Sequence, residues 1–161
     1  MKRISYLLFV SLLCLKTSGL FAQVPFFQSY HPIKRNQPIQ VNAIHQDKKG
    51  FIWLGTEKGL IRFDGTSYKL FTAKDSLPHN NVTALAEDSL GRIWTGHVNG
   101  SLAWLEQDEI HKFEPREGTS TAPISDILFD RSGVMWFSTR ADGLYYFAGD
   151  RMYPVDALER L

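Results

Sequence analysis

Residues 82–106 read VTALAEDSLGRIWTGHVNGSLAWLE, and this stretch occurs three times in related form. The first copy is VNAIHQDKKGFIWLGTEKGLIRFDG at residues 41–65, and the third is ISDILFDRSGVMWFSTRADGLYYFAG at residues 124–149. All three share the frame V/I-x-x-I/L-x-x-D-x-x-G-x-I/M-W, and their tryptophans are 41 and 42 residues apart. A period of this length predicts a fold built by stacking copies of one unit.

Each copy contains four short runs rich in aromatic and β-branched residues, which are separated by turn residues. In the second copy the predicted strands are Val82–Ala86, Arg92–Gly96, Ser101–Leu105 and Glu109–Phe113. Tight hairpins are predicted at residues 63–68 and 147–151. Four antiparallel strands in about 40–45 residues are typical of a β-propeller blade.

The sequence therefore predicts an all-β chain with three four-stranded β-propeller blades. The blades are expected at residues 41–81, 82–123 and 124–161. Three blades are fewer than the usual minimum of about four for ring closure, so an incomplete propeller is expected. Its apolar end faces are expected to pair with missing blades or with a second copy of the chain.

The composition narrows the class of protein without naming a function. The 161 residues carry a formal net charge of +1, with 43% hydrophobic and 22% charged residues. These values are typical of a globular protein, and no basic face indicates nucleic-acid binding. A single cysteine excludes a disulfide framework and a cysteine-based zinc site.

Residues 1–22 have the pattern of a secretory signal peptide. Lys2 and Arg3 precede a mostly apolar run at residues 4–15, and Ala22 marks the expected cleavage site. An uncleaved membrane anchor is the alternative. Residues 23–40 are expected to form a leading outer strand, near Phe26–His31, and a linker. Cleavage would leave a periplasmic chain without a second apolar stretch of membrane length.

The repeat resembles the two-component regulator propeller repeat. The resemblance rests on Asp88-x-x-Gly91-x-Ile93-Trp94-x-Gly96 and its two sister copies. Two positions depart from the pattern: Ser138 replaces the glycine of the other copies, and His97 replaces their threonine. The resemblance implies the periplasmic input region of a hybrid sensor histidine kinase that binds carbohydrate breakdown products. It also implies that the full-length parent continues into further blades and is anchored in the inner membrane.

Residues that recur in every copy are expected to be structural. These residues are Asp47, Asp88 and Asp130, Gly50, Gly91 and Gly133, and Trp53, Trp94 and Trp136. Each aspartate is expected to cap backbone N–H groups in its own Asp-x-x-Gly turn, with a metal or catalytic role as the alternative. Each tryptophan is expected to fill the gap between neighbouring blades, with a ligand platform as the alternative.

Ligand contacts are expected where the copies differ, on the face that carries the loops between the second and third strands and between successive blades. The candidate residues there are His79, Asn80, Asn81, His97, Asn99, Arg140 and Asp142. Polar side chains of this kind, with aromatic rings nearby, suit a sugar. A solvated loop surface without a ligand is the alternative.

Three function classes remain open. The first is an exported ligand sensor, and the second is a propeller-type polysaccharide lyase or glycosidase. The third is a structural or protein-binding module. No catalytic residue, cofactor or metal site is predicted, because the five histidines lack ligand spacing and no nucleophile or phosphate motif occurs.

Overall fold

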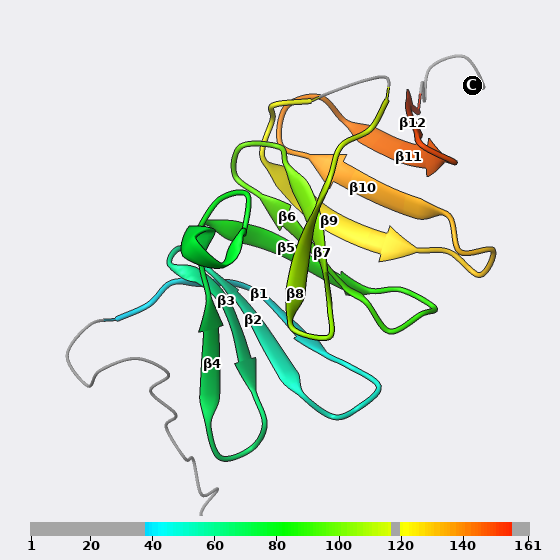
Figure 1. Cartoon of the computed structure of the whole chain (residues 1–161). Coiled ribbons are helices and arrows are strands. Elements are labelled where there is room, and N and C mark those ends of the chain that lie inside the picture. Colours follow the sequence, from blue (N-terminus) through cyan, green and yellow to red (C-terminus); the bar gives the residue numbers. More distant parts are fainter. Residues whose placement is uncertain (1–37, 117–119, 156–161) are drawn as a thin grey trace, which may run out of the picture. The chain divides into compact units, whose positions relative to one another are not determined.

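Three antiparallel sheets of four strands make up the part of the chain that the computed structural model describes, residues 38–116 and 120–155 (Figure 1). The first sheet contains β1 (Val41–Gln46), β2 (Ile52–Thr56), β3 (Gly59–Phe63) and β4 (Tyr68–Phe71). The second contains β5 (Val82–Glu87), β6 (Ile93–His97), β7 (Leu102–Glu106) and β8 (Glu109–Phe113). The third contains β9 (Ile124–Phe129), β10 (Met135–Thr139), β11 (Leu144–Ala148) and β12 (Arg151–Pro154).

Each sheet is a meander in which strands consecutive in sequence are neighbours in space. The predicted all-β blade fold is therefore confirmed, and the predicted strands of the second copy agree with β5–β8 to within a residue at each end. Sheets one, two and three are called blades 1, 2 and 3 below. The predicted signal peptide and the leading strand at Phe26–His31 lie outside the described residues.

The turn between the second and third strands differs from the sequence alignment. Counting from each tryptophan in the sequence matches Gly100 with Gly59 and places one extra residue in the third copy alone, before Gly143. In the structure Gly55 pairs with Leu60, whereas Gly96 pairs with Leu102, so the second copy also has the longer turn. Gly100 is inside that turn with φ +79°, a conformation that glycine adopts readily.

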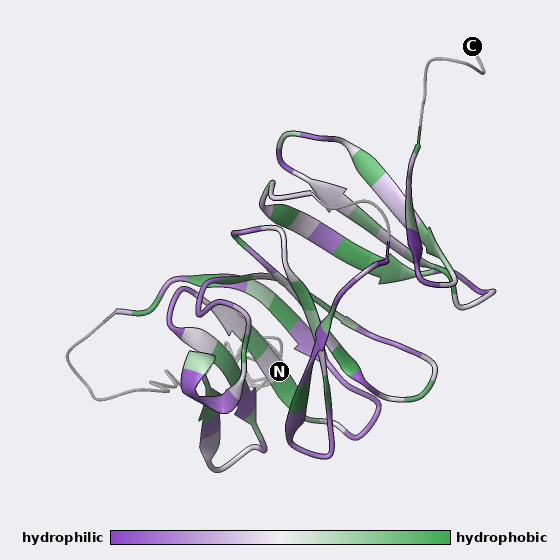
Figure 2. Ribbon diagram, turned by 45° about the horizontal axis from the view of Figure 1, so that its top comes forward, coloured by the Kyte–Doolittle hydropathy of each residue, from purple (hydrophilic) through white to green (hydrophobic). Residues whose placement is uncertain are grey.

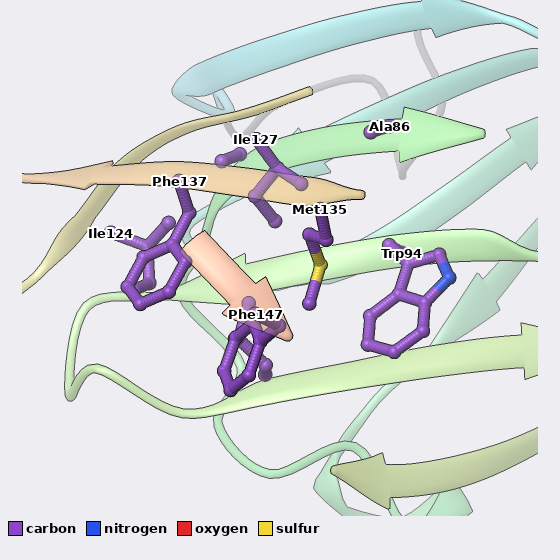
Figure 3. Packing of buried hydrophobic residues seen from close by; sticks show 9 residues of the cluster. Ala86, Trp94, Ile124, Ile127, Met135, Phe137 and Phe147 are labelled. Atoms are coloured by element: carbon purple, nitrogen blue, oxygen red, sulfur yellow. The ribbon is translucent and has the colours of Figure 1, made fainter. Parts of the chain in front are cut away.

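Blades pack face to face through two apolar joints. Trp53 and Leu60 of blade 1 join Val82 and Leu105 of blade 2 in one buried cluster. The second cluster, between blades 2 and 3, includes the side chains in Figure 3, among them Trp94. Figure 2 shows that the connecting loops are mostly hydrophilic, so the apolar residues concentrate on the strands. Burial of these side chains is the main driving force for stacking the sheets.

A glycine on the second strand lets the next blade approach closely at each joint. A Cβ atom on Gly55 would lie 3.0 Å from Val82 Cγ1, and one on Gly96 would lie 2.5 Å from Ile124 Cγ2. Ser138 occupies the corresponding position in blade 3, opposite Leu144.

The connection from blade 1 to blade 2 contains a short 3₁₀ helix, η1 (Ala73–Asp75), which the sequence did not predict. Thr72 and Asp75 form a capping box around it. A single turn of this kind has no detectable hydrophobic period.

Candidate functional site

The aspartates shared by all copies organise the turn after each inner strand. In blade 2, Asp88 Oδ1 accepts hydrogen bonds from the backbone N–H groups of Leu90 and Arg92, at 2.9 and 3.0 Å. Asp88 Oδ2 accepts the indole N–H of Trp94, a contact that sequence reasoning missed. The indole bond recurs in every blade, with Nε1–Oδ2 distances of 2.8 Å for Trp53–Asp47, 2.9 Å for Trp94–Asp88 and 3.1 Å for Trp136–Asp130.

In blades 2 and 3 these contacts favour the ionised carboxylates of Asp88 and Asp130. Burial by itself would raise the pKa of Asp88, but hydrogen bonds from Trp94 and Arg92 outweigh it and lower that pKa overall. The indole of Trp136 is the largest cause of a lowered pKa at Asp130. Each of the three carboxylates accepts at least three hydrogen bonds within its own blade, which agrees with the structural role expected from the sequence.

Two of the three repeated tryptophans are buried where blades meet. Trp53 and Trp94 are 3% and 5% exposed, and each belongs to the cluster at its joint. Trp136 is only half-buried and lies against Tyr146 of its own blade, with ring centroids 5.2 Å apart. The same Asp–Trp unit therefore reaches full burial where another blade covers it.

Each of the predicted ligand residues of the β4–β5 connection accepts a hydrogen bond from blade 1 or from the connection itself. Asn81 Oδ1 accepts a hydrogen bond from Asn42 Nδ2, and Asn80 Oδ1 accepts one from the backbone N–H of Ala73. His79 Nδ1 accepts the backbone N–H of Asn81. His79 and Asn80 remain exposed, so their other polar atoms face solvent.

The other predicted residues lie on the turns of blades 2 and 3. Asn99 Oδ1 accepts hydrogen bonds from the backbone N–H and the hydroxyl of Ser101, at 3.3 and 2.6 Å. Asp142 Oδ2 accepts the hydroxyl of Ser120 at 2.6 Å. Arg140 is exposed. Asn99 thus holds its own turn, whereas Asp142 joins the β10–β11 turn to the connection between blades 2 and 3.

His97 requires a correction, because it was placed on an exposed loop and its side chain is fully buried. The ring Nε2 lies 3.0 Å from Thr95 Oγ1, and Nδ1 is buried without a partner among the described residues. In blades 1 and 3 the same position is Thr56 or Thr139, whose hydroxyl bridges the turn. In blade 2, Asn99 forms the hydrogen bonds that hold the turn, so position 97 does not need a threonine hydroxyl and can hold the imidazole ring of His97.

Backbone hydrogen bonds join the loops that carry some of the predicted residues. The backbone N–H of Val98 donates to the carbonyl of Asn81, which joins the β4–β5 connection to the β6–β7 turn. The N–H of Arg140 donates to Pro123 in the same way. Asn99 and Ser120 also line one cavity of about 270 Å³ between blades 2 and 3. Of the seven predicted residues, only Asn99 lines that cavity.

Two further grooves lie between the blades beside the aspartate turns. One, of about 290 Å³, contains Arg62 of blade 1 and Asp108 of blade 2, which form an ion pair. The other, of about 370 Å³, is lined by Trp94, Trp104 and Arg92 among others. Arg92 Nε bonds Asp88 Oδ2 at 2.6 Å, so its charge is already paired.

Protonation of His97 should make the fold acid-sensitive. Burial lowers the pKa of its imidazole from 6.5 to about 4. Between these pH values the unfolded chain takes up a proton that the folded chain refuses, so stability falls as pH drops from 6.5 to 4. The full loss is about 3 kcal/mol. Urea unfolding at pH 7 and pH 4.5 should show most of it, and His97→Thr should flatten the profile. Parallel profiles for the two proteins would contradict this assignment.

Residues 38–116 and 120–155 hold no group of three or more His, Cys, Asp or Glu side chains suited to a metal ion. Over the same residues, no helix has the length and apolarity needed to cross a bilayer.

Two segments of the chain match a known family of repeats. The family model described as "Two component regulator propeller" matches residues 35–58 and 76–99. The curated protein "Histidine kinase P4" of Formosa agariphila is 42% identical over 45 residues, which cover 28% of this chain and 3% of that protein.

Solved structures share the fold. One is the extracellular domain of a protein described as a hybrid two component system from B. thetaiotaomicron, with a TM-score of 0.65 and 29% identity over 76% of this chain. This chain covers 17% of that domain. Virginiamycin B lyase from Staphylococcus aureus has a TM-score of 0.61 and 16% identity, over 77% of this chain and 44% of the lyase. This chain therefore spans less than half of these relatives, and two of its segments, residues 35–58 and 76–99, match the two-component regulator propeller repeat.

Proposed function

We propose that this chain is part of the ligand-sensing propeller of a two-component sensor, exported to the periplasm. The observation that carries the proposal is the similarity to the extracellular domain of the hybrid two component system, at 29% identity over 76% of the chain. The match to the regulator propeller family points the same way. The lyase similarity, at 16% identity, extends only to the fold.

The proposed ligand is a carbohydrate-derived molecule bound on the face that carries the β4–β5 connection and the β6–β7 and β10–β11 turns. Support comes from the difference between the residues that repeat in every blade and the residues that vary. Repeated aspartates and tryptophans hold the blades, whereas exposed Asn80, Asn99 and Arg140 vary between blades and keep polar atoms in contact with solvent. Amide and guanidinium groups donate hydrogen bonds that fit the paired hydroxyls of a sugar.

Calorimetric titration of the chain with a panel of oligosaccharides tests the proposal. At least one should bind, and Arg140→Ala or Asn99→Ala should weaken it at least tenfold. Lys112→Ala, which removes another exposed long side chain on outer strand β8, is the matched control and should leave affinity unchanged.

The same mixtures of protein and oligosaccharide distinguish a sensor from an enzyme and from a protein-binding module. Release of new reducing ends from a bound oligosaccharide would replace the sensor with a lyase or glycosidase. Failure of every oligosaccharide, together with capture of a specific protein, would favour a protein-binding module.

Export can be tested separately by N-terminal sequencing of the protein made in cells. We expect the mature chain to begin near Gln23. An intact Met1 in the membrane fraction would contradict cleavage.

A further inference from the structure

The groove of about 290 Å³ beside the aspartate turns of blades 1 and 2 is lined by several charged groups. Lys49 and Arg62 of blade 1 line it, together with Gln107 and Asp108 of the β7–β8 turn of blade 2. Asp47 lines it as well, but both of its carboxylate oxygens accept hydrogen bonds from blade 1 itself. The charged groups that can still meet a ligand are therefore mostly cations.

Arg62 is held in a fixed orientation in this groove. Its guanidinium lies over the rings of Phe51 and Trp53, 5.0 and 5.6 Å from their centroids. Nη1 donates to one carboxylate oxygen of Asp108, and the Lys69 ammonium donates to the other oxygen at 2.8 Å. A guanidinium has five N–H groups at its edge, so Arg62 keeps donors that no described residue uses.

The groove holds more positive charge than its own carboxylate compensates. The hydrogen bond from Lys69 is the largest cause of a lowered pKa at Asp108, so this carboxyl group is ionised at neutral pH. Among the described residues, the Lys49 ammonium and the Gln107 side-chain amide have no partner. Three cations thus surround one available carboxylate, and such an arrangement attracts a further anion.

The joint between blades 2 and 3 has aromatic rings in place of two of these cations. Strand pairing places Arg62 opposite Trp53 and Lys69 in blade 1, whereas Trp104 pairs with Trp94 and His111 in blade 2. Because blades 2 and 3 pack together without the cluster of cations, the stacking of blades does not require it.

We propose that this groove binds a small hydroxylated carboxylate. The planar carboxylate fits the remaining N–H edge of Arg62, because guanidinium and carboxylate groups form paired hydrogen bonds. The Lys49 ammonium adds a second cation, and the Gln107 amide provides a donor and an acceptor for a hydroxyl group. The groove lies at the end of the strands opposite the loops proposed to bind sugar, and it does not depend on that proposed function.

Amide chemical shifts measured during a titration with gluconate test the proposal. Gluconate carries a carboxylate on a hydroxylated chain, and glucitol is the matched neutral control. Gly91 lines the groove, whereas Gly133 has the same place in the turn of blade 3 and does not line it. At constant ionic strength, gluconate should shift the Gly91 amide and the Gln107 side-chain amide saturably, with a dissociation constant on the order of 1 mM. The Gly133 amide should stay in place, and glucitol should shift none of these signals.

Two charge variants should change the affinity for gluconate in opposite directions. Lys49→Gln removes an exposed cation that lines the groove and should weaken binding at least threefold. Asp108→Asn removes the carboxylate that competes for Arg62 and Lys69, and should strengthen binding at least threefold. Lys74→Gln removes the same charge from η1, which does not line the groove, and should leave the affinity unchanged. A purely structural ion cluster predicts no such increase in affinity.

Several results would overturn the proposal. These are equal shifts with gluconate and glucitol, a linear shift without saturation, unchanged affinity in Lys49→Gln, and weaker binding in Asp108→Asn. Displacement of gluconate by an equal concentration of sulfate at the same ionic strength would show a site for any small anion, which also contradicts it. Failure of neutral oligosaccharides to shift the variable loops would count against the proposed sensing function alone.

Discussion

Trp94→Ala lowers the free energy of unfolding by about 3–5 kcal/mol, the range for deleting a large buried aromatic side chain. Trp94 fills the joint between blades 2 and 3, with ring centroids 5.2 Å from Trp104, 5.4 Å from Phe113 and 5.9 Å from Phe129. The variant also removes the indole N–H that Asp88 Oδ2 accepts. Loss of contacts in a rigid joint leaves a cavity that neighbouring sheets cannot close.

Trp136→Ala is the matched control for this experiment. It removes the same residue type and the same bond to its aspartate, but Trp136 is only half-buried. We expect a loss of about 1–2 kcal/mol, so the difference between the variants reports the packing between blades. Urea unfolding of both proteins gives the two values. Equal losses would contradict the role of Trp94 in the joint.

Gly96→Ser destabilises the chain by about 3 kcal/mol, near the upper end of the usual cost of overpacking. Its Cβ atom would lie 2.5 Å from Cγ2 and 2.8 Å from Cβ of Ile124, which is completely buried. Blade 3 would have to move away from blade 2 to admit the side chain, which would loosen the whole joint. The new residue is the one that blade 3 has naturally at Ser138.

The reverse change, Ser138→Gly, is the control and should cost no more than about 1 kcal/mol. The double variant Gly96→Ser with Ile124→Ala should be more stable than the sum of the single losses by over 1 kcal/mol, because each change relieves the other. Thermal and urea unfolding of the unmodified chain, Gly96→Ser, Ile124→Ala and the double variant measure this coupling. Additive losses would show that Gly96 does not set the distance between the blades.

Most of the fold could be predicted from the sequence, because the same residue types have the same structural roles in each copy of the repeat. Asp88, Gly91 and Trp94 recur with fixed spacing because Asp88 caps a turn, Gly91 takes a positive φ and Trp94 fills a joint. The sequence did not reveal the indole–carboxylate bond, because hydrogen bonds between side chains six residues apart depend on the strand register. Gly100 is matched with the wrong residue for a similar reason. The length of the turn between the second and third strands becomes known only when the pairing of those strands is known.

Less of the candidate site could be predicted from the sequence, because residues vary between copies for more than one reason. His97 differs from the threonines of the other blades and was therefore assigned to the ligand surface, yet the difference reflects a buried ring. Asn99 varies because it took over the bracing of its turn. The cavity between blades 2 and 3 could not be predicted, since its walls come from residues far apart in sequence.

The central claim is that repeated residues hold the blades together and variable residues bind the ligand. Mapping amide chemical shifts during an oligosaccharide titration tests it most directly. Ligand should shift the amides of residues 79–81, Asn99, Arg140 and Asp142, and leave those of Gly50, Gly91 and Gly133 in place. Shifts confined to these three glycines, or no shift with any oligosaccharide, would contradict it.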